Sequence, residues 1–150
     1  MKKLILATIL AALFVSCSKE ESVSSVEIEG VWTLKSLYGL TRYDLNNDGV
    51  ESSNLLQEYY GCGADNTLTF SEDGTVLFHR QKLVSTINCS EVDFEGTWTK
   101  KGNNLTLVFP DETSVYKINP SDQTISIQIT PYGYTSLGAV TAIFIYKKQE

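Results

Sequence analysis

The sequence predicts an all-β fold, namely an eight-stranded antiparallel up-and-down barrel with a short helix in its long first loop. Apolar and polar residues alternate with a period of two over eight separate segments. Tight-turn sequences such as Glu72-Asp73-Gly74 and Lys101-Gly102-Asn103 join some of these segments. No segment within this succession has the pattern of a crossover helix, so consecutive strands should pair antiparallel. Closure into a barrel then removes the exposed edges.

Each expected strand presents one apolar face. In the first, Trp32, Leu34 and Tyr38 should share a face, and in the third His79 lies opposite Val76 and Phe78. The expected strands are residues 31–38, 66–71, 75–80, 94–99, 105–109, 113–118, 125–129 and 141–147.

The alternation of apolar and polar residues is interrupted over residues 39–65. Within them, residues 54–60 have the pattern of one or two helical turns. A connection this long in a compact domain is usually functional or carries structure of its own.

The stretch 44–55, "DLNNDGVESSNL", resembles a calcium-binding loop. Calcium takes six to eight oxygen ligands, which such a loop supplies at alternate positions, with a glycine at position six for the sharp turn. Asp44, Asn46 and Asp48 occupy positions one, three and five, and Gly49 occupies position six. The ligands expected after the glycine are the Val50 carbonyl and Ser52.

The twelfth position of this loop departs from the pattern, because it holds Leu55 in place of a bidentate glutamate. If a helix begins near Ser53, Glu58 lies about one turn beyond Leu55 and could supply the missing group, while Glu51 is nearer but points outward. The alternative is a polar turn without metal, which Asp, Asn and Gly form through side-chain to backbone hydrogen bonds.

The N-terminal segment predicts export. A basic Met1-Lys2-Lys3 precedes an apolar run over residues 4–15, which is a secretory signal and is too short for a membrane-spanning helix of about 20 residues. With Ser16 directly before Cys17, the segment resembles a bacterial lipoprotein signal. That resemblance implies that Cys17 is acylated, with palmitate among its chains, becomes the first mature residue and anchors the protein to the membrane.

The predicted domains are a signal peptide over residues 1–16, a lipidated flexible tether over 17–27 and the barrel over 28–150. Lys19-Glu20-Glu21 resembles a tag that sends lipoproteins to the cell-surface side of the outer membrane, which is the expected location. The same stretch also suits a plain solvated tether, because a polar, serine-rich segment cannot bury enough apolar area to fold.

Charge and cysteine content restrict the partners. Removal of residues 1–16 leaves 10 basic against 18 acidic side chains, a net charge of −8, so the basic surface that nucleic acids require is absent. Apart from Cys17, the chain holds only Cys62 and Cys89, which should form a disulfide in an oxidising compartment.

The residues do not predict an enzyme. His79 is the only histidine, so a catalytic zinc site with three protein ligands is not expected. Asp93 and Glu95 are a conceivable acid–base pair, but they alternate with an apolar residue as the solvated face of a strand does. Tyr132 and Tyr134 are expected to pack with their hydroxyls in water rather than to stack on a sugar.

Gly30-Val31-Trp32 looks like the glycine-x-tryptophan mark of the lipocalins. Together with the lipoprotein signal and a second Gly96-Thr97-Trp98-Thr99, it makes residues 28–148 resemble the small lipocalin-like lipoproteins of bacterial cell envelopes. This resemblance implies that the barrel binds a small apolar or amphipathic ligand. The alternative is a filled barrel that serves as a non-catalytic surface module for a protein or glycan partner. The side chains large enough to fill the interior are Trp32, Phe70, Phe78, Trp98, Phe109 and Phe144.

Overall fold

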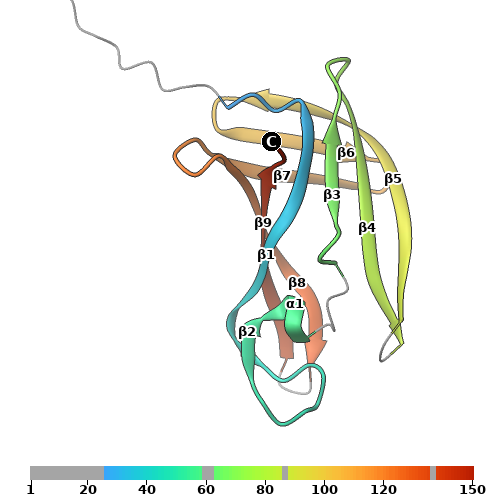
Figure 1. Ribbon diagram of the computed structural model, residues 1–150, viewed down its shortest axis with the longest axis vertical. Helices are drawn as coiled ribbons and strands as arrows, with labels where there is room; N and C mark the ends of the chain where they lie inside the picture. The colour runs from blue at the N-terminus through green and yellow to red at the C-terminus, as the bar shows by residue number, and fades with distance from the viewer. Residues whose placement is uncertain (1–25, 59–62, 86–87, 136–137) are drawn as a thin grey trace, which may run out of the picture.

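The computed structural model describes residues 26–58, 63–85, 88–135 and 138–150 (Figure 1). The predicted signal peptide, Cys17 and the Lys19-Glu20-Glu21 tag lie outside these residues and remain predictions. The elements are β1 (Gly30–Tyr43), β2 (Ser52–Asn54), α1 (Leu55–Glu58), β3 (Thr67–Phe70), β4 (Thr75–Ser85), β5 (Asn88–Lys101), β6 (Asn104–Phe109), β7 (Glu112–Asn119), β8 (Thr124–Thr135) and β9 (Gly138–Lys148).

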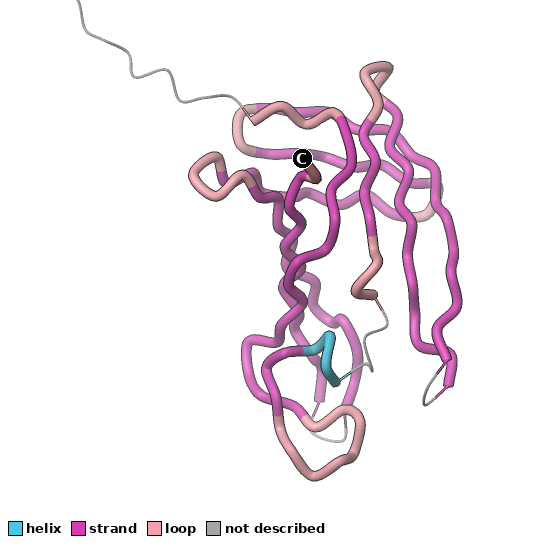
Figure 2. The backbone as a smooth tube through the Cα atoms, viewed as in Figure 1, coloured by secondary structure: helices cyan, strands magenta, loops and turns pink. Residues whose placement is uncertain are grey.

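Eight of these strands form a closed antiparallel barrel. Its order is β1-β3-β4-β5-β6-β7-β8-β9, and β1 also pairs with β9, which closes the sheet. The short β2 pairs with the outer part of β1 and lies outside the closed ring. Figure 2 shows strands along most of the described chain and the short helix α1. The predicted fold class is therefore confirmed.

One expectation about β1 is wrong. Trp32 and Leu34 are buried as predicted, but the register to β9 shifts between Leu34 and Ser36. An extra residue in a strand inverts the alternation of its faces. As a result Leu37 is 2% exposed and packs in the core, whereas Tyr38 is 37% exposed on the outer face.

Several boundaries also differ from the predicted ones. β1 continues to Tyr43, which pairs with Ser52 of β2, so the interrupted region is largely a hairpin whose tip is the calcium-like loop. The helix begins at Leu55, two residues later than Ser53. β4 and β5 extend beyond residues 80 and 94, and their pairing continues to Ser85 and Asn88.

One end of the barrel is closed and filled. The chain before β1 crosses this end, and the indole Nε1 of Trp32 donates a 2.7 Å hydrogen bond to the carbonyl of Ile28. Gly30 permits this path because its φ is +110°, which L side chains rarely adopt. Trp32, Phe70 and Trp98 then pack edge to face, with ring centroids 6.5 and 5.7 Å apart.

Within the described ranges, no helix has the length and apolar character that crossing a membrane requires.

Candidate functional site

The wall of the barrel is open on one side, because the β6–β7 hairpin is short. β5 pairs with β6 only from Thr97 to Lys101, and β7 pairs with β8 only from Lys117 to Asn119. In the described part of the chain, the first half of β5 therefore has no paired strand on its β6 side. The second half of β8 likewise has no paired strand on its β7 side. Pro110 and Asp111, in the turn between β6 and β7, lie beside this opening, because both line the cavity described next.

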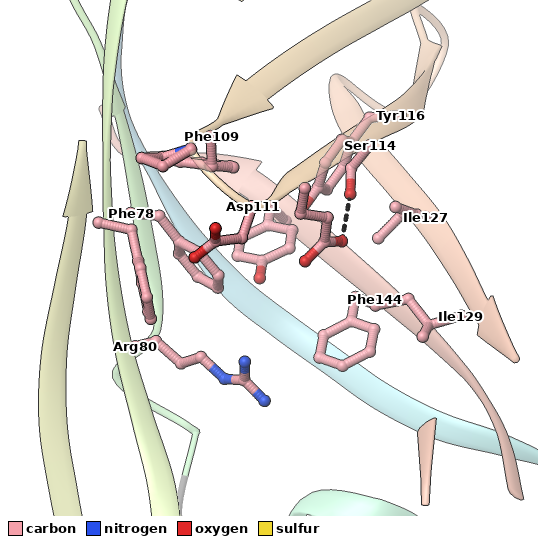
Figure 3. Close-up of a pocket in the computed structure, with 13 residues that line it drawn as sticks. Phe78, Arg80, Phe109, Asp111, Ser114, Tyr116, Ile127, Ile129 and Phe144 are labelled. Carbon is pink, nitrogen blue, oxygen red and sulfur yellow. Dashed lines mark hydrogen bonds between the residues drawn. The ribbon is translucent and has the colours of Figure 1, made fainter. Parts of the chain in front are cut away.

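A cavity of about 330 Å³ lies behind the opening (Figure 3). This volume is at the small end of the range of ligand pockets, about 300 to 1,000 Å³. Aromatic and branched aliphatic side chains make up most of its lining. The lining residues are Phe78, Arg80, Phe94, Phe109, Pro110, Asp111, Glu112, Ser114, Tyr116, Ile127, Ile129, Phe144 and Tyr146.

The lining changes character from floor to mouth. Tyr116, Phe144 and Tyr146 are 5%, 7% and 1% exposed and form an aromatic floor continuous with the barrel core. Arg80, Asp111 and Glu112 are exposed and form the charged rim. As far as the described residues line it, the cavity is therefore amphipathic, with a mainly apolar interior and its ionised groups at the mouth.

Gly96 determines the shape of one aromatic wall. It follows Phe94 on the inner face of β5, and a Cβ there would lie 2.7 Å from the Phe109 ring and collide with the Val108 carbonyl. Glycine in a strand often marks such a close approach. Phe109 consequently packs beside Phe78, with ring centroids 6.1 Å apart. The second Gly-x-Trp stretch thus has a local packing role.

The polar groups of the lining have distinct partners. The Ser114 hydroxyl donates a 2.6 Å hydrogen bond to Oε1 of Glu112. Burial raises the pKa of Tyr116 well above its usual value; the negative charge of Glu112 raises it further, and the positive charge of Arg80 opposes this. The phenol therefore stays protonated at neutral pH. Arg80 makes no hydrogen bond or ion pair with any residue in the described part of the chain.

The predicted calcium loop forms the tip of the β1–β2 hairpin. Asp44 accepts hydrogen bonds from the amides of Asp48 and Gly49, both at 3.1 Å, and Asp48 accepts one from the amide of Val50 at 2.8 Å. Asn46 Oδ1 also accepts from the Asp48 amide, at 3.1 Å. The side-chain oxygens at positions one, three and five therefore all accept from amides of the loop itself, which the metal-free turn also predicts.

The other predicted ligands lie around this tip. Glu58 is 2% exposed and accepts a 2.8 Å hydrogen bond from the amide of Leu45, so it sits beside the loop. Ser52 Oγ accepts from the amide of Asn54, and the Glu51 carbonyl accepts from the Arg42 guanidinium. Among the described residues, no three His, Cys, Asp or Glu side chains are grouped as a metal centre. The calcium site stays a prediction.

Among the other predicted residues that the structure describes, His79, Asp93 and Cys89 do not line the cavity. His79 Nδ1 lies 2.7 Å from Asp93 Oδ1, and both side chains are solvent-accessible on the outer face of β4 and β5. Cys89 is at the start of β5, while Cys62 and the side chains of Tyr132 and Tyr134 lie outside the described residues.

Arg80 is not among the site residues that the sequence predicted. A signal was present, since the period of two that places Val76 and Phe78 on the inner face also places Arg80 there. A positively charged residue on the apolar face of a strand is therefore the sequence feature that indicates this site.

A family model, that of the lipocalin-like domain, matches residues 28–127, which is well over half of the chain. The crystal structure of the wild-type fluorescent protein UnaG is similar over 81% of this chain and 97% of that chain, with 12% sequence identity and a TM-score of 0.36. No curated protein matches the chain. The family match agrees with the Gly30-Val31-Trp32 motif and with the closed eight-stranded barrel. The chain belongs to the family of lipocalin-like domains.

Proposed function

We propose that this protein binds a small apolar or amphipathic molecule in the cavity beside the β6–β7 turn. The observation that carries this proposal is the aromatic-lined space of about 330 Å³ behind an opening in the barrel wall. The filled-barrel alternative fits only the closed end, where Trp32, Phe70 and Trp98 pack together. Phe78 and Phe144 line the cavity instead of filling it.

The residues that line the cavity favour a binding protein over an enzyme. None of the described lining residues is a histidine or cysteine, and Ser114 donates to Glu112, a carboxylate that no other described residue orients through a hydrogen bond or ion pair. A nucleophile needs an adjacent base that accepts its proton and that is oriented by a third group. The family of lipocalin-like domains also supports a binding role.

Filling the cavity should abolish binding. We expect Ile127→Trp to weaken the binding of Nile red, a neutral apolar dye, at least tenfold, because the indole would occupy the space between β8 and the floor. The measurement is fluorescence titration. Gln128→Trp is the matched control, since Gln128 is the exposed neighbour on the outer face of β8, and it should bind as the wild type does. Equal affinity of Ile127→Trp and the wild type would contradict a site in this cavity.

Native mass spectrometry of envelope-purified protein should in addition detect a retained small molecule.

The lipid anchor and the disulfide belong to the same proposal. The apolar run over residues 4–15 followed by Ser16-Cys17 supports acylation and outer-membrane attachment, and the following acidic tag supports exposure on the cell surface. Cys89 is disulfide-bonded, which supports its proposed pairing with Cys62. Such a bridge would link the tip of the β4–β5 hairpin to the segment after α1, and it would contribute about 2 to 4 kcal/mol to stability.

We further propose that the hairpin tip binds calcium. The hydrogen bonds that Asp44, Asn46 and Asp48 accept from amides of the same loop hold three oxygen-bearing side chains at one hairpin tip. This supports the proposal, because calcium prefers carboxylate and amide oxygens. With only two certain carboxylates, the expected dissociation constant is about 10⁻⁴ to 10⁻³ M.

Calcium should therefore stabilise the protein. At about ten times the dissociation constant, the gain in unfolding free energy is about 1.4 kcal/mol, which thermal unfolding would detect as a raised Tm. Asp48→Ala should eliminate the shift, while Asp65→Ala, which removes an exposed carboxylate outside the loop, should preserve it. Glu58→Gln tests whether this buried side chain completes the site. If calcium and a chelator leave the wild-type Tm unchanged, the tip is a metal-free turn.

A further inference from the structure

We propose that the ligand is an amphiphile that enters the cavity tail first, and that Arg80 holds its anionic group, a carboxylate or phosphate, at the mouth. This inference rests on the proposed function and adds the chemical class and orientation of the ligand.

The distribution of polarity in the cavity fixes the orientation. Its floor consists of buried aromatic side chains, of which Phe144 and Tyr146 are at most 7% exposed, whereas the exposed charged residues are at the rim. Burial of an ionised group in an apolar environment without a partner is costly. An amphiphile therefore places its tail against the floor and its charged end at the rim.

Arg80 is placed to receive that charged end. It follows Phe78 by two residues on the inner face of β4, and Figure 3 shows its side chain extending from the strand into the cavity toward Phe144. Its guanidinium makes no ion pair or hydrogen bond among the described residues. A guanidinium offers planar, paired donors that match the two oxygens of a carboxylate or phosphate.

The two rim carboxylates do not neutralise Arg80. Asp111 and Glu112 come from the β6–β7 turn, and neither is within 4 Å of the guanidinium nitrogens. Glu112 accepts the Ser114 hydroxyl hydrogen bond. A cationic head group at Asp111 is the rival arrangement, and it makes the opposite prediction about charge.

The experiment compares ligands that share one alkyl chain and differ in head group. The assay measures how tightly each ligand displaces bound Nile red, and the four ligands are dodecanoate, dodecyl phosphate, dodecanol and dodecylamine. The proteins compared are the wild type, Arg80→Met and Arg80→Lys, all as the full chain. We expect the wild type to bind dodecanoate or dodecyl phosphate at least tenfold more tightly than dodecanol. Arg80→Met should eliminate this preference and leave the affinity for dodecanol unchanged, and Arg80→Lys should retain part of it. The two anionic ligands distinguish a carboxylate from a phosphate.

Lys35→Met is the matched control, because it removes one exposed positive charge on β1, which does not line the cavity. It should preserve the preference for anions. Tighter binding of dodecylamine, or an anion preference that survives in Arg80→Met, would overturn the role of Arg80 while leaving the cavity as a binding site. Failure of the wild type to bind Nile red and all four ligands would instead refute the proposed function. Because Arg80 is exposed, both variants should fold, and an unchanged Tm verifies this.

Discussion

Replacement of Trp32 by alanine should lower the free energy of unfolding by about 3 to 5 kcal/mol, as expected for deletion of a large buried aromatic side chain. Trp32 is 0% exposed, lies edge to face against Phe70, and donates its indole hydrogen bond to Ile28. The variant loses the packing of the closed end and leaves the buried Ile28 carbonyl without its donor. Equilibrium unfolding in urea measures the effect.

Two further variants separate packing from hydrogen bonding. Trp32→Phe retains an aromatic ring but removes the donor, so it should cost less than the alanine variant, with about 1 to 3 kcal/mol from the unsatisfied carbonyl. Trp98→Ala is the control in the second Gly-x-Trp stretch, where the indole is only partly buried and donates to the Ser71 carbonyl. A loss below 1 kcal/mol in Trp32→Ala would show that Trp32 does not hold the closed end together.

The barrel could be predicted from the sequence because its determinants are local. Alternating segments and tight turns specify antiparallel neighbours, and Gly30-Val31-Trp32 marks the start of the first strand. The bulge after Leu34 has no such local mark. It inverts the faces of the rest of β1, so the environment of Tyr38 could be learned only from its pairing with β9.

The cavity was less predictable, since its volume depends on how distant side chains meet. The sequence indicated that six large aromatic residues could fill the interior, but it could not assign them to two ends of the barrel. In the structure Trp32, Phe70 and Trp98 fill the closed end, whereas Phe78 and Phe109 stand beside the opening. The short β6–β7 hairpin produces this difference, because it leaves the wall between β5 and β8 incomplete.

Replacement of Cys17 by alanine should abolish membrane attachment. The resemblance to a lipoprotein signal implies that this thiol is the acylation site, and each buried methylene of an acyl chain contributes about 0.8 kcal/mol to membrane binding. The apolar run over residues 4–15 is shorter than the about 20 residues that a spanning helix needs. Without the lipid, the barrel should therefore leave the outer-membrane fraction.

Labelled palmitate and fractionation test this expectation together. The wild type should incorporate palmitate and sediment with the outer membrane, and Cys17→Ala should do neither. Cys89→Ser is the matched control, because it removes a different thiol and should still be acylated. Replacement of Lys19, Glu20 and Glu21 by alanine should keep the lipid but lose access to protease on intact cells, which separates anchoring from surface display. A Cys17→Ala protein that still sediments with outer-membrane lipid would show that attachment arises elsewhere in the chain.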